Sequence, residues 1–230
     1  MREASSRRER LRFLLRRLRR PAVLGTLRRM APLSRSFGYD RGRPVDRYYI
    51  ERFLQLNADV ITGRVLEVKD PGYTRAFGHD VTEEAVLDVD RTNERATIYA
   101  DLTDADAIAE GTFDCIILTQ TLQLIYDVPA ALRHCRRILK PGGTLLVTVP
   151  VVSRVIAEPG RFLDYWRFTE HSCRRLFLEH FGDDIEVTSH GNVLSCVAFL
   201  MGMAREELRR HELDHQDADF SLLVTIRARK

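Results

Sequence analysis

The chain has 230 residues, of which 44% are hydrophobic and 30% are charged, and its formal net charge at pH 7 is +3. This length fits one α/β domain with a short extension, and its core is large enough to fold without disulfides. No apolar run reaches 18 residues, and arginines interrupt every early apolar run, which excludes a predicted membrane span and a signal peptide. The four cysteines lack metal-binding spacing, which indicates a reduced, cytoplasmic protein.

The N-terminal region is strongly basic. Residues 1–47 carry 15 arginines and four acidic residues, a net charge of +11. Four leucines fall at helical spacing with arginines on the other faces, which predicts an amphipathic helix within residues 1–20 and a linker to residue 43: Leu11, Leu14, Leu15 and Leu18. Such a helix is typical of segments that contact an acidic partner or an anionic membrane surface, which here would be the inner face of the membrane. A poorly ordered extension and a helix lying across its own domain stay open, whereas sparse aromatic residues argue against a nucleic-acid partner.

Residues 44–230 predict a single domain of alternating strands and helices. Short apolar runs bounded by turns predict strands over 64–68, 85–90, 96–99, 113–118 and 144–149, with a helix over 128–139. Further strands are expected over 185–189 and 222–227. Because most of these strands are apolar on both faces, we predict an α/β fold: a Rossmann-like, doubly wound, mostly parallel seven-stranded sheet with an antiparallel strand near the C-terminus.

Several blocks of this domain resemble the class I S-adenosylmethionine (SAM) dependent methyltransferases, of the type 11-like kind. The blocks are VLEV at 65–68, ADL at 100–102, FDCIIL at 113–118 and LKPGGTLLVTVP at 139–150. The resemblance implies SAM as cofactor and methyl transfer to a small molecule. The block DYWRFT at 164–169 is similar to enzymes found beside glycosyltransferases, which implies a glycan or sugar acceptor and O-methylation.

The resemblance also implies which residues contact the cofactor. Ligands of an open parallel sheet lie outside the carboxyl ends of its strands. Asp88, or alternatively Asp90, would accept hydrogen bonds from the ribose hydroxyls, and Glu67 would orient the following loop through its backbone amides. The remaining predicted contacts are the only glycine of that loop, the two residues that would receive the adenine, and one residue after the fourth strand: Gly72, Asp101, Leu102 and Gln120.

The loop after the first strand departs from the family pattern E-x-G-x-G-x-G. Its three expected glycine positions hold Lys69, Pro71 and Tyr73, and only Gly72 is present, one position out of register. The order Asp-Pro-Gly-Tyr favours a type II β-turn with a positive φ at Gly72. Two functions stay open: a methyltransferase that retains SAM, or a methyltransferase-like binding or scaffolding module that has lost it and partners a glycan-pathway enzyme.

The predicted catalytic residues follow the fifth and sixth strands. Arg167 and His171 would lie at the rim where an acceptor enters, and His190 ends the next strand; either histidine is a candidate base and Arg167 a candidate acceptor contact. An aromatic rim with an arginine suits a sugar or a phosphorylated sugar. The pattern HELDH at 211–215 matches a zinc motif, but its charged surroundings favour a solvated helix end, and no metal site is predicted.

Overall fold

The computed structural model describes residues 11, 15, 18, 25–156 and 163–230, and it divides into two units, 1–32 and 33–230. In the first unit, Leu11, Leu15 and Leu18 are helical and exposed, and Gly25–Leu27 forms a short 3-10 helix. The rest of the predicted amphipathic helix lies outside the described residues. None of the helices in the described part of the chain is long and apolar enough to cross a membrane.

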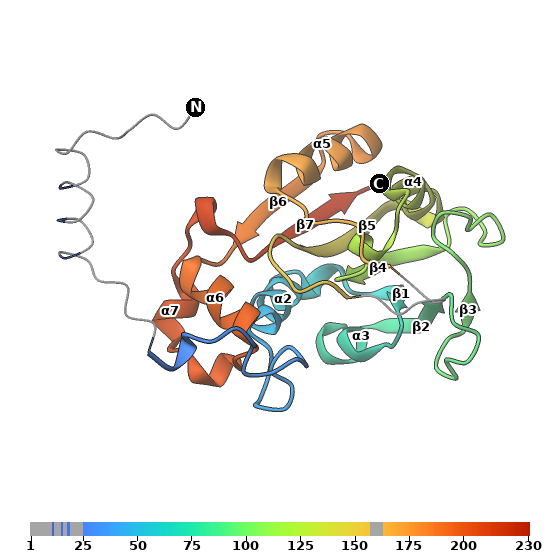
Figure 1. The fold of residues 1–230 in the computed structure, drawn as a ribbon. Helices are drawn as coiled ribbons and strands as arrows, with labels where there is room; N and C mark the ends of the chain where they lie inside the picture. Colours follow the sequence, from blue (N-terminus) through green and yellow to red (C-terminus); the bar gives the residue numbers. More distant parts are fainter. Residues whose placement is uncertain (1–10, 12–14, 16–17, 19–24, 157–162) are drawn as a thin grey trace. The chain divides into compact units, whose positions relative to one another are not determined.

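The second unit is built on a seven-stranded sheet with the order β3-β2-β1-β4-β5-β7-β6 (Figure 1). Neighbouring strands from β3 to β5 run parallel, and β7 runs antiparallel to both β5 and β6. The strands are β1 Gly63–Val68, β2 Val81–Asp88, β3 Ile98–Tyr99, β4 Phe113–Thr119, β5 Leu139–Pro150, β6 Ile185–His190 and β7 Leu223–Arg229. This topology confirms the predicted fold class, including the antiparallel strand near the C-terminus.

The largest differences from the sequence-based strand boundaries are at β2 and β5. β2 begins at Val81, four residues before the predicted start, and ends at Asp88, so that Asp90 lies beyond the strand. β5 begins at Leu139 rather than Thr144, because Leu139 pairs with Phe113 before the register shifts and regular pairing resumes at Thr144. The Lys-Pro-Gly-Gly segment is therefore an irregularity within the strand and not a turn that precedes it.

Helices cover both faces of the sheet, and each face has its own apolar core (Figure 1). Successive side chains of a strand point to opposite faces, so Leu66 and Ile116 enter one core while Val65 and Ile117 enter the other. α4 and α5 contribute to the first core, and α2, α6 and α7 to the second. The helices are α2 Val45–Leu56, α3 Gly72–Phe77, α4 Val128–Ile138, α5 Glu170–Phe181, α6 Val193–Met201 and α7 Arg210–Asp214.

Residues 33–43, which the sequence assigns to a linker, pack against the end of α6. The backbone N–H of Leu33 donates to the Met201 carbonyl at 2.7 Å, and the rings of Phe37 and Phe199 stack at 5.8 Å. Gly38 has a φ of 91°, and a Cβ there would lie 2.6 Å from the Met203 carbonyl oxygen, so this position requires glycine. The compact unit therefore begins at Leu33.

Candidate functional site

A small cavity lies at the carboxyl ends of β1 and β2, where an open parallel sheet places its ligand. Its volume is about 250 Å³. The cavity is lined by residues at and just after the ends of these two strands: Lys69, Asp70, Asp88, Asp90, Asn93 and Arg95. The cavity thus brings together three carboxylates and two cations, and Asp88, the predicted ribose acceptor, is one of the carboxylates.

Glu67 anchors the loop on one side of this cavity. Its side chain is only 3% exposed; Oε1 accepts from the Tyr73 N–H at 3.0 Å, and Oε2 accepts from the Thr74 N–H at 2.8 Å and the Thr74 hydroxyl at 2.7 Å. Burial raises the pKa of Glu67, and the hydrogen bonds from Thr74 and Tyr73 offset part of that effect. Glu67 therefore holds the loop through backbone amides, as predicted, although no cofactor contact follows from this geometry alone.

Lys69 occupies a backbone conformation that glycine adopts readily. Its φ is 77°, and it stands at the position where the family pattern has its first glycine. The Lys69 N–H donates to the Leu87 carbonyl at 2.9 Å, and its carbonyl accepts from Asn93 Nδ2 at 2.8 Å. The chain therefore keeps the turn of a glycine after β1, and these bonds to β2 and to the loop beyond it hold the strained residue in place.

The predicted type II turn at Gly72 is wrong. Pro71 has a ψ of 27° rather than the value near +120° that such a turn needs, and Gly72 begins α3 without a positive φ. The cause is the carboxylate of Glu67, which binds the N–H groups of Tyr73 and Thr74 and so closes the chain into a helix. Gly72 is exposed, and its N–H donates to Asp70 Oδ1 at 3.0 Å.

Asp88 is fixed at the tip of β2 with acceptor capacity to spare. Its Oδ1 accepts from the Asp90 N–H at 2.9 Å, and its Oδ2 accepts from Asn93 Nδ2 at 2.8 Å. A carboxylate offers about four lone-pair positions, so these two bonds leave room for two hydroxyl donors. Asn93 also binds the Lys69 carbonyl, and it therefore joins the ends of β1 and β2; the sequence analysis did not identify this residue.

The other predicted cofactor residues lie at the same edge of the sheet. Asp101 follows β3, is exposed, and accepts from the backbone and the hydroxyl of Thr103 at 2.8 Å, whereas Leu102 is buried in the core. Gln120 follows β4 with a φ of 50°, and its N–H donates to the Thr148 carbonyl at 2.8 Å. The structure thus places Glu67, Asp88, Asp101 and Gln120 at the carboxyl ends of four strands of the parallel part of the sheet.

Beyond β4, the buried residue Gln123 ties two segments together, and neither its type nor its spacing indicates this role. Its backbone carbonyl accepts from the N–H groups of Tyr165 and Trp166 at 2.8 and 3.3 Å, and its side-chain Nε2 donates to the Gln120 carbonyl at 2.7 Å. Among the described residues, Gln123 Oε1 has no hydrogen-bond donor. These bonds join the residues after β4 to the segment around Tyr165 at the carboxyl edge of the sheet.

The predicted rim residue Arg167 is held in a structural ion pair. Its guanidinium donates to both oxygens of Asp164, at 2.5 and 2.8 Å, and to the Arg154 carbonyl at 2.8 Å. Only 1% of the Asp164 side chain is exposed. Burial alone would raise the pKa of Asp164, but the hydrogen bonds from Arg167 outweigh it and lower that pKa. These contacts occupy the donors that an acceptor phosphate would need.

Neither predicted base is among the residues that line the cavity. His171 is exposed in the first turn of α5. His190 ends β6 at the opposite edge of the sheet, four strands from β1, which corresponds to about 19 Å at the usual spacing. Its Nε2 bonds Thr225 Oγ1 at 2.8 Å, and burial lowers its pKa to about 4. The structure does not bring His171 and His190 together with the residues around Asp88.

The HELDH segment forms α7 and its end. His211 is exposed, Glu212 accepts from the Arg209 N–H at 2.7 Å, and the carbonyl of His215 accepts from Asn192 Nδ2 at 2.8 Å. Within the ranges that the structure describes, no group of three or more His, Cys, Asp or Glu side chains is placed to hold a metal ion. The four cysteines are buried and unbridged.

The protein has an open-sheet α/β fold with a cavity at the carboxyl ends of β1 and β2. Among the solved structures that share this fold are two with low sequence identity, so the likeness shows the fold alone. A SAM-dependent methyltransferase from Archaeoglobus fulgidus has a TM-score of 0.53 at 12% identity, over 80% of this chain and 94% of that one. The [4+2]-cyclase SpnF has a TM-score of 0.50 at 19% identity, over 78% of this chain and 81% of that one.

Sequence comparisons define the family more closely. Residues 60–147 match the family model described as a methyltransferase domain. The polyketide synthase ThaQ of Burkholderia thailandensis is 30% identical over 76 residues, which is 31% of this chain and 4% of that protein. The ubiquinone/menaquinone biosynthesis C-methyltransferase UbiE of Klebsiella pneumoniae is 45% identical over 56 residues, 24% of this chain and 22% of that protein.

The family model confirms the predicted methyltransferase family for the core of the domain, residues 60–147. The chain spans only 4% and 3% of the first two curated relatives, both polyketide synthases. The match begins just before β1 and ends within β5, so it includes Glu67, Asp88 and Gln120 but not the segment around Trp166.

Proposed function

We propose that the chain catalyses SAM-dependent methyl transfer to a small-molecule acceptor. The observation that carries the proposal is the cavity at the ends of β1 and β2, where Lys69 keeps a glycine-like turn beside the Asp88 carboxylate. SAM, when bound, supplies an electrophilic methyl group, and the protein's task is to align the nucleophile with it. The atypical loop is compatible with this task, because its backbone follows the course that the missing glycine would take.

The residues present fit the cofactor. Asp88 would accept the two ribose hydroxyls, since each of its oxygens already accepts one hydrogen bond and retains further capacity. Glu67 would keep the loop in place through Tyr73 and Thr74. Asp101 and Leu102 would receive the adenine, and Gln120 would face the methionine end or the acceptor. Gly72 stays a proposed contact through its exposed backbone at the start of α3.

The acceptor atom and the acceptor class are further parts of the proposal. The DYWRFT segment supports an oxygen nucleophile on a sugar or glycan. Such a hydroxyl needs a base, and of the two candidates the exposed His171 is favoured over His190, which is buried at the far edge of the sheet. The relative UbiE is named as a C-methyltransferase, so carbon is the competing acceptor atom. Product analysis by mass spectrometry and NMR would distinguish an O-methyl from a C-methyl group.

The competing function is a methyltransferase-like binding or scaffolding module without SAM. It draws support from the missing glycines and from the [4+2]-cyclase SpnF, whose name shows that the fold also occurs in a protein named for another reaction. Calorimetry of the full chain with SAM and with S-adenosylhomocysteine separates the two. We expect binding of both in the micromolar range; no heat at millimolar ligand would contradict the enzyme.

Asp88→Ala tests the site itself. Removing an acceptor of two ribose hydroxyls should weaken SAM binding by about 100-fold or more, because each of the two hydrogen bonds to a charged group contributes about 1.5–3 kcal/mol. Asp59→Ala is the matched control, since Asp59 is exposed and precedes β1, at the opposite edge of the sheet. Equal SAM affinity in Asp88→Ala and the wild type would show that the ribose lies elsewhere.

The basic leader adds a proposal about location. The charge of +11 over residues 1–47 supports contact of residues 1–20 with an acidic partner or an anionic surface at the inner face of the membrane. Deletion of residues 1–20 should abolish sedimentation with vesicles containing phosphatidylserine and leave SAM affinity unchanged. Equal sedimentation of both proteins would overturn this role.

A further inference from the structure

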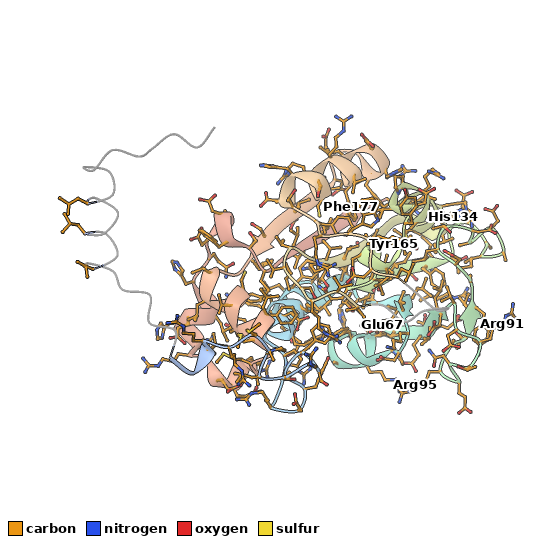
Figure 2. All side chains as sticks on the ribbon, in the orientation of Figure 1. Glu67, Arg91, Arg95, His134, Tyr165 and Phe177 are labelled. Carbon is orange, nitrogen blue, oxygen red and sulfur yellow. The ribbon has the colours of Figure 1, made fainter. Side chains whose placement is uncertain are left out.

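Three aromatic side chains form an exposed cluster beside the proposed acceptor side of the domain. Tyr126 follows the short 3-10 helix after β4, and Tyr165 and Trp166 lie on the segment after β5; we call these three residues the aromatic trio (Figure 2 labels Tyr165). The rings of Tyr126 and Trp166 stack at 5.8 Å, and those of Tyr126 and Tyr165 meet edge to face at 5.3 Å. The trio follows the carboxyl ends of β4 and β5, and the Gln123 backbone carbonyl binds the Tyr165 and Trp166 N–H groups.

The trio is exposed but firmly held. The exposed fractions are 69% for Tyr126, 44% for Tyr165 and 39% for Trp166. Trp166 Nε1 donates to the Ile125 carbonyl at 3.0 Å, and the backbone N–H groups of Tyr165 and Trp166 both donate to the buried Gln123. The rings are therefore presented to solvent by a framework that is already formed, so a ligand that stacks on them would not have to order them first.

The charged residues next to the trio are occupied. The guanidinium of Arg167 is bound to Asp164 and to backbone carbonyls, and that of Arg154 lies over the Phe37 ring at 4.2 Å. Among the described residues of this segment, these are the cations that a phosphorylated acceptor would use. Aromatic faces with engaged cations favour an uncharged ring over a sugar phosphate.

We propose that the aromatic trio is the acceptor platform, on which an uncharged ring of the acceptor stacks while its reacting atom faces the cofactor side. This assignment rests on the proposed methyl transfer. It adds a class of acceptor, and two of its three residues, Tyr165 and Trp166, lie outside the matched segment 60–147. Tyr126 provides the most exposed face, and Trp166 supports it from behind.

Fluorescence gives a direct test, because Trp166 is the only tryptophan of the chain. Phenol, methyl β-glucoside and glucose 1-phosphate are titrated into the full chain with excitation at the red edge of tryptophan absorption. We expect a saturable change in Trp166 emission with phenol or with methyl β-glucoside, and the two arms distinguish an aromatic from a sugar acceptor. Binding of glucose 1-phosphate as tight as that of methyl β-glucoside, or no response to either uncharged probe, would overturn the proposal.

Variants separate stacking from a general loss of structure. Tyr126→Ala should weaken the responding probe about 3- to 10-fold, which is the usual contribution of one aromatic contact, whereas Tyr126→Phe keeps the ring and should bind within about twofold of the wild type. Leu56→Ala is the control, since Leu56 is 74% exposed and ends α2 shortly before β1, at the opposite edge of the sheet. Wild-type affinity in Tyr126→Ala would refute the platform.

SAM calorimetry on the same variants keeps the two proposals apart. We expect Tyr126→Ala to bind SAM like the wild type, and Asp88→Ala to bind the uncharged probe like the wild type. A chain that binds the probe at the trio but not SAM would refute the methyltransferase and leave the platform in place. A chain that binds SAM but gives no Trp166 response would refute the platform and leave the proposed methyl transfer in place.

Discussion

In the loop after β1 and in the segment after β5, the residue types indicate the opposite of what the geometry shows. After β1, the glycines that the family pattern leads one to expect are replaced, yet Lys69 adopts a φ of 77° and the turn keeps its course. After β5, the residues have the types that a catalytic rim needs, yet Arg167 is bound to the buried Asp164 and to backbone carbonyls. From residue types alone, the loop after β1 would be judged unsuited to a ligand and the segment after β5 well suited to one, whereas the geometry indicates the reverse.

The difference comes from which interactions dominate each region. At Lys69, hydrogen bonds to Leu87 and from Asn93 fix the backbone, and they outweigh a left-handed strain of about 1–2 kcal/mol for a residue with a Cβ. At Arg167, a carboxylate with 1% exposure needs a charged partner, and this need takes the guanidinium away from any ligand. The following predictions test these two accounts.

The largest expected effect is on the loop after β1. Glu67→Ala removes three hydrogen bonds and leaves the N–H groups of Tyr73 and Thr74 without their acceptor, so unfolding should become easier by about 4 kcal/mol in urea titrations. Glu84→Ala is the control, because Glu84 makes an exposed ion pair with Arg75, and such pairs contribute about 1 kcal/mol or less. A decrease of less than 1 kcal/mol in the free energy of unfolding of Glu67→Ala would show that the loop keeps its conformation without the Glu67 carboxylate.

His190 provides the second test, at the far end of β6. Burial lowers its pKa to about 4, whereas the unfolded chain binds that proton near pH 6.5. The unfolded state therefore takes up more protons in this window, and stability is lost as the pH falls from about 6.5 to about 4, by about 3 kcal/mol in total. Urea titrations across this range should show a smaller acid loss in His190→Gln than in the wild type.

The matched control for His190 is His171→Gln, which changes an exposed histidine of α5. A wild type and a His190→Gln variant with the same acid loss would mean that the imidazole is accessible to solvent and protons. That result would also return His190 to consideration as a base, since a histidine with a pKa near 7 suits proton removal better than one near 4.

Asp164→Ala addresses the segment after β5 and should cost about 2–3 kcal/mol, because it leaves Arg167 without the carboxylate and the Ile156 N–H without its acceptor. Arg167→Ala should lower stability in the same direction, and Arg167→Lys should recover part of it. If instead Arg167→Ala keeps wild-type stability and lowers only kcat at saturating SAM, the ion pair is incidental and Arg167 acts on the acceptor.

Sequence reasoning reached the fold because its signals are local and repeated. Apolar runs such as 113–118, the helix from Val128 and the Lys-Pro-Gly-Gly segment each constrain the sheet, and their order is enough for the topology. It also located Glu67 and Asp88 through the family pattern. Asn93 and Gln123 were missed, because their importance lies in contacts across loops, which residue type and spacing do not encode.

The smallest effect would sharpen the comparison most. Lys69→Gly relieves the positive φ and should stabilise the fold by about 0.5–1 kcal/mol, reduced by the greater freedom of glycine in the unfolded chain. Lys69→Ala removes the charge but keeps a Cβ, so it separates strain from electrostatics. We expect Lys69→Gly to raise the urea midpoint and Lys69→Ala to leave it near the wild type; equal gains in both would assign the cost to the charge of Lys69 and not to its backbone.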